Sequence, residues 1–209
     1  AAAYFGVQPD LVTYGKTLGG GLPVGVICGR RALMKRCRDD RPLDICFARG
    51  TFNAHPYVMG AMNAFLRRLE TPEVRALYDG IDERWDARAE QLNTALDEAG
   101  VPVRIANLQT IWTVLYTRPA AYNWMLQYYL RAEGLALSWV GTGRLIFSLD
   151  IDDALFADIV RRFVDAARAM ATDGWWDTPA GLTNKTLRRA MLAQALRVRL
   201  RGQAAAASG

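Results

Sequence analysis

The sequence contains no hydrophobic run that approaches the ~20 residues a transmembrane helix requires, so it predicts no membrane span. It has a single histidine, His55, and only three cysteines, which are Cys28, Cys37 and Cys46. An odd number of cysteines at spacings that match neither a zinc site nor a redox motif predicts reduced thiols and no metal site. Reduced thiols are typical of a cytoplasmic protein, which is the expected location.

Acidic residues are absent from the last part of the chain. From Thr178 onward the sequence has no acid and six basic residues, which are Lys185, Arg188, Arg189, Arg197, Arg199 and Arg201. They account for the whole formal net charge of +5, so we expect no nucleic-acid function for the body of the protein. Leucines and a methionine among these residues predict a basic helix, which either docks on its own subunit or binds an acidic partner domain or an anionic surface.

Glycine is instead concentrated around one lysine, in residues 10–25 (DLVTYGKTLGGGLPVG). A β-prone run ends at Lys16 and a triple glycine follows, which would let a flat ligand approach the lysine closely. Residues 15–17 (Gly-Lys-Thr) also have the ending of a nucleotide-binding P-loop. That motif needs a glycine where this chain has Asp10, and a helix where the triple glycine would break one. We therefore favour imine chemistry between Lys16 and a carbonyl cofactor.

Residues 9–25 closely resemble the cofactor-lysine segment of the class III aminotransferases, a family that includes ornithine and acetylornithine enzymes and glutamate-1-semialdehyde aminomutases. The resemblance continues at residues 29–31 (Gly-Arg-Arg) and 50–56 (GTFNAHP). It implies an α/β fold, the C-terminal part of a fold-type-I transferase, in which the end of a large domain precedes a small α+β domain. It also implies pyridoxal 5′-phosphate as the cofactor. The alternative for Lys16 is an exposed lysine in a glycine turn.

The resemblance implies roles for Lys16, Gly50 and Thr51. Lys16 would form the internal aldimine with the cofactor and then act as the proton shuttle of amino-group transfer. Gly50 and Thr51 would bind the cofactor phosphate of the other subunit, which implies a homodimer. The alternative for the Thr51 hydroxyl is a cap on the helix that follows it.

Arg144 stands where relatives that use amino acids place an arginine for the substrate carboxylate, a contact that suits a planar guanidinium. Residues 147–148 (Phe-Ser) replace two prolines that are common in the family, so a surface salt bridge is the alternative for Arg144. His55 stands where the family usually has asparagine, and we expect it to be a turn residue without a catalytic role.

Apolar periodicity predicts the domain organisation. Residues 1–70 are expected to form the end of the large cofactor-binding domain, with a strand at 11–14, a buried strand at 24–28 and a helix from Pro56. Residues 71–100 predict one long connecting helix, residues 101–173 a small α+β domain, and residues 174–209 a basic tail. Within the small domain we expect strands at 101–105, 110–116, 135–140 and 144–149, and helices at 120–132 and 151–170.

A pyridoxal site also needs an acid for the ring nitrogen, an aromatic over the ring and a phosphate loop, and this sequence has no match to the family's motifs for them. We therefore expect the chain to be a C-terminal piece of a longer protein. The predicted function is amino-group transfer, as an aminotransferase or an aminomutase, on a small-molecule amino donor and carbonyl acceptor. The sequence specifies neither substrate. The alternative is a non-catalytic C-terminal domain that acts in dimerisation or partner binding.

Overall fold

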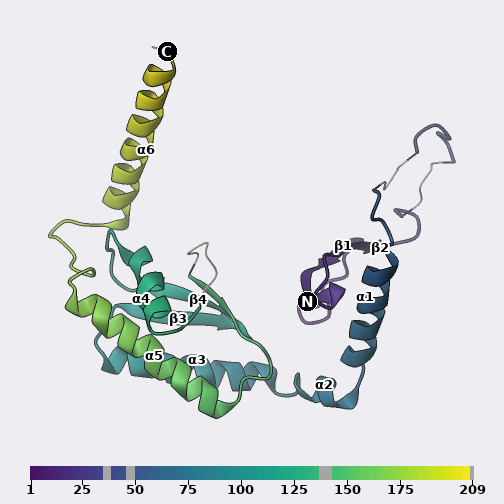
Figure 1. Cartoon of the computed structure of the whole chain (residues 1–209), viewed down its shortest axis with the longest axis horizontal. Helices are drawn as coiled ribbons and strands as arrows, with labels where there is room; N and C mark the ends of the chain where they lie inside the picture. The colour runs from purple at the N-terminus through teal and green to yellow at the C-terminus, as the bar shows by residue number, and fades with distance from the viewer. Residues whose placement is uncertain (35–38, 46–49, 137–142, 208–209) are drawn as a thin grey trace. The chain divides into compact units, whose positions relative to one another are not determined.

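The computed structural model of the chain describes residues 1–34, 39–45, 50–136 and 143–207, with side chains described to residue 199. The chain divides into two compact units, residues 1–79 and residues 80–209 (Figure 1). Each unit is built from both helices and strands, as the sequence predicts. None of the described helices is long and apolar enough to cross a membrane.

The first unit is a two-stranded antiparallel sheet followed by two helices. Strands β1 (Leu11–Gly15) and β2 (Gly25–Gly29) are joined through the short 3₁₀ helix η1 (Lys16–Gly19). Helix α1 (Pro56–Leu69) packs against η1, and α2 (Pro72–Ala76) follows it. Proline at the first position of both helices fits their starts, because that position has no partner for a backbone N–H.

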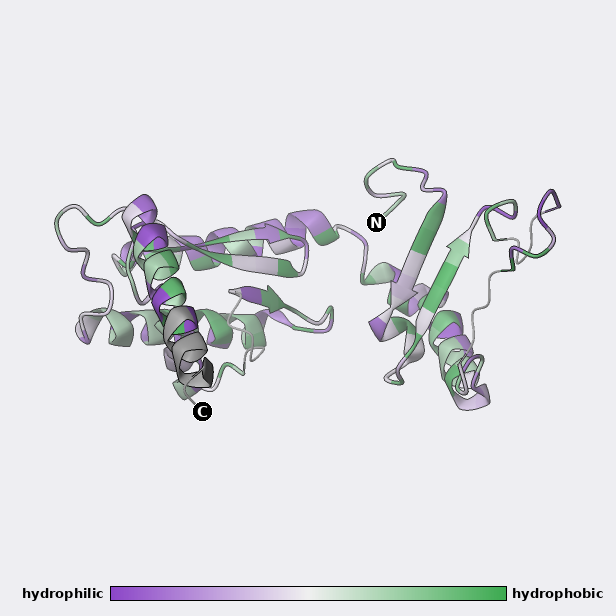
Figure 2. Cartoon of the chain, turned by 90° about the horizontal axis from the view of Figure 1, so that it is seen from above, coloured by the Kyte–Doolittle hydropathy of each residue, from purple (hydrophilic) through white to green (hydrophobic). Residues whose placement is uncertain are grey.

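Nearly all of the first unit is accessible to solvent. Among its described residues only Gly19 is buried, and the hydrophobic residues of both strands, green in Figure 2, are half-buried or exposed. The expectation of a buried strand at 24–28 is therefore wrong for this chain: β2 lies one residue later and Ile27 is 62% exposed. A two-stranded sheet with one helix on it is too small to enclose a core of its own.

The long connecting helix predicted for residues 71–100 is wrong. The structure has the short α2, a turn over residues 77–80 and then α3 (Ile81–Glu98). Gly80 ends the turn with a φ of +60°, a left-handed conformation that glycine adopts without strain. Leu77 and Ile81 are four residues apart, so the apolar pattern continues across the break and does not reveal it.

The second unit contains the hydrophobic core. Its sheet is antiparallel with strand order β3-β4-β5, formed by Val103–Leu108, Ile111–Tyr116 and Arg144–Ile146. Helix α3 packs on β3, and α5 (Asp153–Thr172) packs against α3 and α4 (Leu126–Ala132), with the 3₁₀ helix η2 (Asn123–Met125) leading into α4 (Figure 1). The predicted strand at 135–140 extends into residues 137–142, which lie outside the described residues.

Four aromatic side chains from four parts of the second unit meet at the centre of this core: Trp85, Trp112, Phe147 and Phe156. Trp85 lies edge-on to Trp112, with 5.9 Å between their ring centroids, and stacks on Phe147 at 5.2 Å. Such aromatic pairs contribute roughly 0.5–1.5 kcal/mol each beyond the burial of their area. Phe156, Phe163 and Met170 form the inner face of α5, whereas Leu155 at the start of the helix is exposed.

The chain ends in α6 (Asn184–Ala207), which begins at a side-chain cap. The backbone N–H of Thr186 donates to Thr183 Oγ1 at 3.1 Å, and the backbone N–H of Thr183 donates to Thr186 Oγ1 at 2.9 Å. This reciprocal pair satisfies N–H groups that would otherwise lack partners at the helix start. The helix predicted from Asn184 onward is confirmed.

Candidate functional site

Lys16 lies directly after the last residue of β1 and begins η1. Its φ is +54°, a left-handed conformation that is uncommon for a residue with a side chain, and the side chain is exposed. The Lys16 amine has no hydrogen bond or ion pair with any described residue. The strand end therefore presents this amine to solvent, where a ligand can reach it.

The glycines after Lys16 allow the chain to turn back closely onto α1. Gly20 has a φ of +58°, and a Cβ atom there would lie 3.1 Å from the carbonyl oxygen of Ala61 and 3.6 Å from Phe65 Cβ. At Gly19 a Cβ atom would lie 3.0 Å from Val24 Cγ1. A side chain at Gly20 would push the turn away from α1, and one at Gly19 would press on Val24 at the start of the return strand. Gly20 thus allows the close approach of the Lys16 end of the hairpin to α1.

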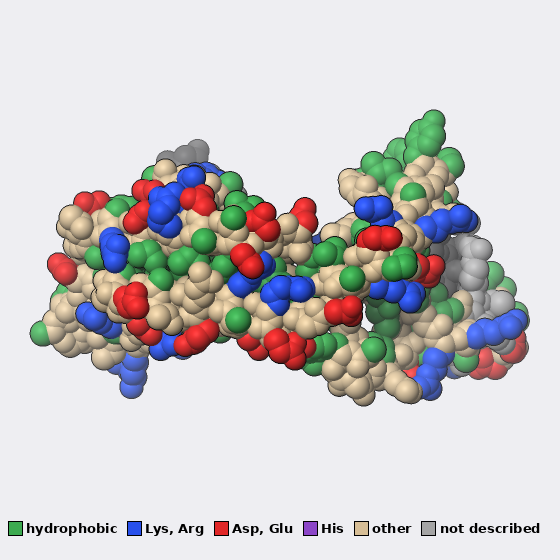
Figure 3. All heavy atoms as spheres, turned by 90° about the horizontal axis from the view of Figure 1, so that it is seen from below, with side chains coloured by type: hydrophobic (Ala, Val, Ile, Leu, Met, Phe, Trp, Pro, Cys, Tyr) green, Lys and Arg blue, Asp and Glu red, His purple; other side chains and the backbone are tan. Residues whose placement is uncertain are grey.

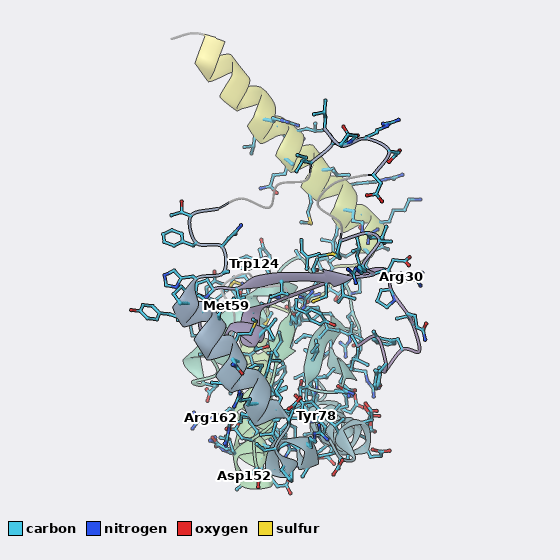
Figure 4. The ribbon with its side chains drawn as sticks, turned by 90° about the vertical axis from the view of Figure 1, so that its right-hand side faces the viewer. Arg30, Met59, Tyr78, Trp124, Asp152 and Arg162 are labelled. Atoms are coloured by element: carbon cyan, nitrogen blue, oxygen red, sulfur yellow. The ribbon has the colours of Figure 1, made fainter. Side chains whose placement is uncertain are left out.

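The other end of the hairpin is closed by an ion pair that the sequence analysis did not identify. Arg30, labelled in Figure 4, places its Nε atom 3.0 Å from Asp10 Oδ1. The Arg30 backbone N–H also donates to the Asp10 carbonyl oxygen at 3.1 Å. Both residues lie in the segments that resemble the family, which is the signal that could have identified them. The pair sets the register of β1 against β2 and so the position of Lys16.

Gly50 and Thr51 begin the turn that leads into α1. The Gly50 carbonyl oxygen accepts the backbone N–H of Asn53 at 3.1 Å, while the exposed Thr51 hydroxyl has no hydrogen bond with any described residue. His55 is the N-cap residue of α1, and no side chain caps this helix. The alternative that Thr51 caps the helix is therefore not observed, and its hydroxyl is left available beside an uncapped helix N-terminus.

His55 is held between two aromatic rings at this turn. Its ring centroid lies 6.0 Å from that of Phe52 and 5.3 Å from that of Tyr57. Its Nδ1 atom is buried and has no hydrogen-bond partner among the described residues. In the described part of the chain, no group of three or more His, Cys, Asp or Glu residues could hold a metal ion. The position of His55 at a helix start agrees with the expectation of a turn residue.

Arg144 belongs to the second unit, whereas Lys16, Gly50 and Thr51 belong to the first. It begins β5 opposite Thr113 of β4 and lies on the exposed face of the sheet, because the next residue, Leu145, is buried. The Arg144 guanidinium makes no ion pair with a described carboxylate. A surface salt bridge is thus not observed among the described residues, and the guanidinium is available to an anion.

Comparison with known proteins identifies the family. Residues 1–167 match the sequence model of the family described as Aminotransferase class-III. The chain belongs to the class III aminotransferase family. It is 40% identical to a glutamate-1-semialdehyde 2,1-aminomutase of Nitratidesulfovibrio vulgaris over 113 residues. This matched stretch covers 54% of this chain and 25% of that protein. A relative of the same name from Hydrogenobaculum is 32% identical over 117 residues. The chain thus spans about a quarter of the length of the curated relatives it matches.

Solved structures of aminotransferases have the same fold. An omega-transaminase from Sphaerobacter thermophilus is similar to this chain with a TM-score of 0.65 and 26% identity, over 80% of this chain and 40% of the transaminase. A structure described as a transaminase with PLP bound gives a TM-score of 0.68 over 83% of this chain and 41% of that protein. The mixed α/β fold expected from the sequence is confirmed. In both comparisons the class III chain corresponds to about two fifths of a transaminase.

Proposed function

We propose that this chain contributes to pyridoxal-phosphate-dependent amino-group transfer and that Lys16 is the residue that bonds to the cofactor. The observation that carries the proposal is the exposed Lys16 amine at the end of β1, on a glycine turn packed against α1. A lysine at a strand end, with no partner for its amine in the described residues, can present that amine to a planar aldehyde. Membership in the class III family supports this assignment.

The described residues fit part of such a cofactor. Lys16 supplies an amine, and the turn at Gly50 and Thr51 supplies a hydroxyl beside the uncapped N-terminus of α1, an arrangement suited to a phosphate. Pyridoxal phosphate, when bound, supplies the electron sink that makes a substrate Cα proton removable. We place Thr51 on the phosphate of a second subunit, so that the site is completed in a dimer.

Two side chains would act on the substrate. The Lys16 amine, when it is not bonded to the cofactor, would be the base that takes the proton from the substrate Cα and holds it at Nζ for return. The Arg144 guanidinium would hold the substrate carboxylate by two parallel hydrogen bonds and so orient the Cα proton. The substrates are a small-molecule amino donor and a carbonyl acceptor. We place the reaction in the cytoplasm.

The name of the matched relatives favours glutamate-1-semialdehyde as the substrate and a 1,2-shift of the amino group as the reaction. An aminomutase needs no second substrate, whereas an aminotransferase needs a separate carbonyl acceptor. Turnover of a single amino aldehyde without an added keto acid would support the aminomutase. A strict requirement for a keto acid would support the aminotransferase instead.

A second candidate function is a non-catalytic one, in which the chain only pairs with another polypeptide. The exposed apolar residues of the first unit favour it, because a surface such as the one around Ile27 is stable when another chain covers it. This candidate predicts no selective reaction at Lys16. Reactivity of that amine therefore separates the two functions.

The composition of the chain provides an internal control for the test. It has three lysines, Lys16, Lys35 and Lys185. We would incubate the whole chain with pyridoxal phosphate, reduce it with borohydride and map the trapped adduct by peptide mass spectrometry. We expect the label at Lys16 in preference to Lys185, and its loss in Lys16→Ala but not in Lys185→Ala. Equal labelling of all three lysines would contradict the proposal.

Binding to the isolated chain should nevertheless be weak. Without a ring acid, a stacking aromatic and a phosphate loop, little slows the release of a cofactor held by Lys16. We therefore expect the adduct to form only at high cofactor concentration before reduction. Tight, stoichiometric binding and turnover by the 209-residue chain alone would show that these residues suffice, against our expectation.

A further inference from the structure

The side chains of α6 have almost no partners in the structure. Leu187 is half-buried, but Met191, Leu192 and Leu196 are 67%, 65% and 60% exposed. The helix forms nevertheless, because it begins at the reciprocal cap of Thr183 and Thr186 and is rich in residues with high helix propensity. Helix α6 is therefore already formed, and it exposes leucines that a binding partner could cover.

One face of α6 combines leucine and basic residues. Leu192 and Leu196 are four residues apart, and four basic residues lie three, four or seven positions from one of them: Lys185, Arg188, Arg189 and Arg199. Residues at these spacings share a helix face. This face, which we call the basic face, carries no acid. Arg197 lies on the other side of the helix, one position after Leu196.

The body of the second unit carries the opposite charge. The exposed side of α3 holds a stripe of four acids at helical spacings of three, four and seven: Glu83, Asp86, Glu90 and Asp97. Acidic side chains line one edge of this unit in Figure 3. Exposed Ala87 and Thr94 lie beside the acids and present no bulky side chain. We call this surface the acidic face of α3.

Two of these acids already have partners within the chain. Asp86 Oδ1 accepts from Asn107 Nδ2 at 2.7 Å, and Asp97 Oδ2 lies 3.6 Å from Arg104 Nη1. Glu83 and Glu90 make no hydrogen bond or ion pair with a described residue. The acidic face therefore has carboxylates that can accept new cationic partners.

The two faces also agree in length. At 1.5 Å per residue, the basic face from Lys185 to Arg199 and the acidic face from Glu83 to Asp97 each extend over ~21 Å. Two helices of matching length and opposite charge can form several ion pairs along one contact. Small residues such as Ala87 and Thr94 would let Leu192 and Leu196 approach the α3 backbone.

We propose that α6 docks on the acidic face of α3 in a second copy of this chain, and that the second copy receives the first copy's α3 in the same way. A single copy contains both faces but leaves α6 uncovered, so the cover comes from another molecule. Such a reciprocal contact is closed by a two-fold axis. The proposal is independent of the proposed catalytic role of Lys16.

Other occupants fit α6 less well. Met191 is one position before Leu192, about 100° around the helix, so exposed apolar residues are not gathered on one side. Figure 2 shows hydrophilic and hydrophobic residues following one another along the helix. A helix that lies on a membrane surface gathers its apolar residues on one side. Nucleic acid would leave the exposed leucines without a partner. An acidic protein helix accounts for both the charge and the leucines.

Charge reversal provides a direct test with the full chain. Arg188→Glu/Arg189→Glu makes the basic face repel the acidic face, and Glu83→Lys/Glu90→Lys makes the acidic face repel α6. Each variant alone should lose the salt-sensitive part of self-association, with its dissociation constant raised roughly tenfold or more at low salt, whereas pairing through the first unit should be unchanged. An equimolar mixture should associate again, because each altered face then meets its opposite in the other molecule.

Sedimentation equilibrium at low and high salt would measure these associations, with circular dichroism to confirm that each variant is folded. Arg197→Glu is the matched control, since it reverses a charge on the other side of α6 and should keep near wild-type association. A wild-type chain that stays monomeric would overturn the proposal, as would variants whose mixture does not associate. A monomeric chain that binds phosphatidylglycerol vesicles or duplex DNA through α6 would also overturn it.

Discussion

Asn93 of α3 completes the outer edge of β3 by bonding both backbone groups of Ile105. The Ile105 N–H donates to Asn93 Oδ1 at 2.7 Å, and Asn93 Nδ2 donates to the Ile105 carbonyl oxygen at 3.0 Å. Among the described strands β3 is at the edge of its sheet, so these groups have no neighbouring described strand to pair with. The buried amide of Asn93 takes the place of that strand and joins the helix to the sheet.

Asn93→Ala should therefore destabilise the second unit by about 2–4 kcal/mol, because two buried backbone groups lose their partners. Asn107→Ala is the control, since its amide also bonds across to α3, at Asp86, but in an exposed position. We expect that control to change the free energy of unfolding by less than ~1 kcal/mol. Urea unfolding followed by tryptophan fluorescence measures both, and similar values for the two variants would contradict the role given to Asn93.

Arg88 makes a second buried polar contact in this unit. Its guanidinium lies 4.8 Å from the centre of the Trp85 ring and donates to the Ile151 carbonyl oxygen at 2.9 Å and to Asp153 at 2.8 Å. Arg88→Met should cost about 1–3 kcal/mol, because the carbonyl oxygen loses its donor while the aliphatic stem is kept. Asp153→Asn should cost under ~1 kcal/mol, since the Asp153 side chain is 97% exposed. If urea unfolding showed an equal loss of stability in the two variants, the stabilisation would come from the Arg88–Asp153 ion pair and not from the hydrogen bond to the Ile151 carbonyl oxygen.

Gly20 and Gly25 offer a matched pair of substitutions in the first unit. Gly20→Ala should cost about 1–2 kcal/mol, because an L-residue at a φ of +58° is strained and its Cβ would approach the Ala61 carbonyl oxygen. Gly25 has no atom within 4 Å of an added Cβ and no left-handed φ, so Gly25→Ala should be nearly neutral. Amide hydrogen exchange in β1 and β2 would detect faster opening in the first variant alone.

Tyr116 makes the stability of the second unit sensitive to alkaline pH. Burial raises the pKa of its phenol to about 12, above the unfolded value of 10.0. A raised pKa means that the folded state resists ionisation, so this stabilisation is complete below pH ~10 and is lost as the pH rises through the folded pKa. The loss should reach about 2–3 kcal/mol. Tyr116→Phe should remove that part of the decline between pH ~10 and pH ~12, and an unchanged decline would contradict the assignment.

The sequence was sufficient to predict most elements of the fold, because capping residues and apolar spacing are local signals. Helix α1 starts at the predicted Pro56, and α5 covers nearly the predicted range. Gly6 ends a turn with a φ of +63°, and the Val7 N–H donates to the Ala2 carbonyl oxygen at 3.0 Å. Whether Leu155 or Phe156 faced the core depended on the packing of α5 on the sheet, which a single sequence does not specify.

The sequence predicted those residues of the candidate site that lie within family-like segments. Lys16 and Thr51 lie within segments whose pattern resembles the family, and the structure gives physical reasons for the glycines around them. Asp10 and Arg30 also lie in family-like segments, but their ion pair depends on the pairing of two strands, which the motif alone does not specify. The roles of Lys16, Gly50, Thr51 and Arg144 stay predictions until their chemistry is measured.

The location of the core in the sequence has a consequence for how the protein is made. All buried apolar residues of the described chain lie between Ile81 and Trp176, so the residues around Lys16 leave the ribosome before any of them. The described residues of the first unit supply no core of their own, while the later unit can fold as soon as it is synthesised. Chaperones that bind nascent chains should therefore contact the lysine-bearing hairpin longer than the aromatic cluster of Trp85 and Trp112.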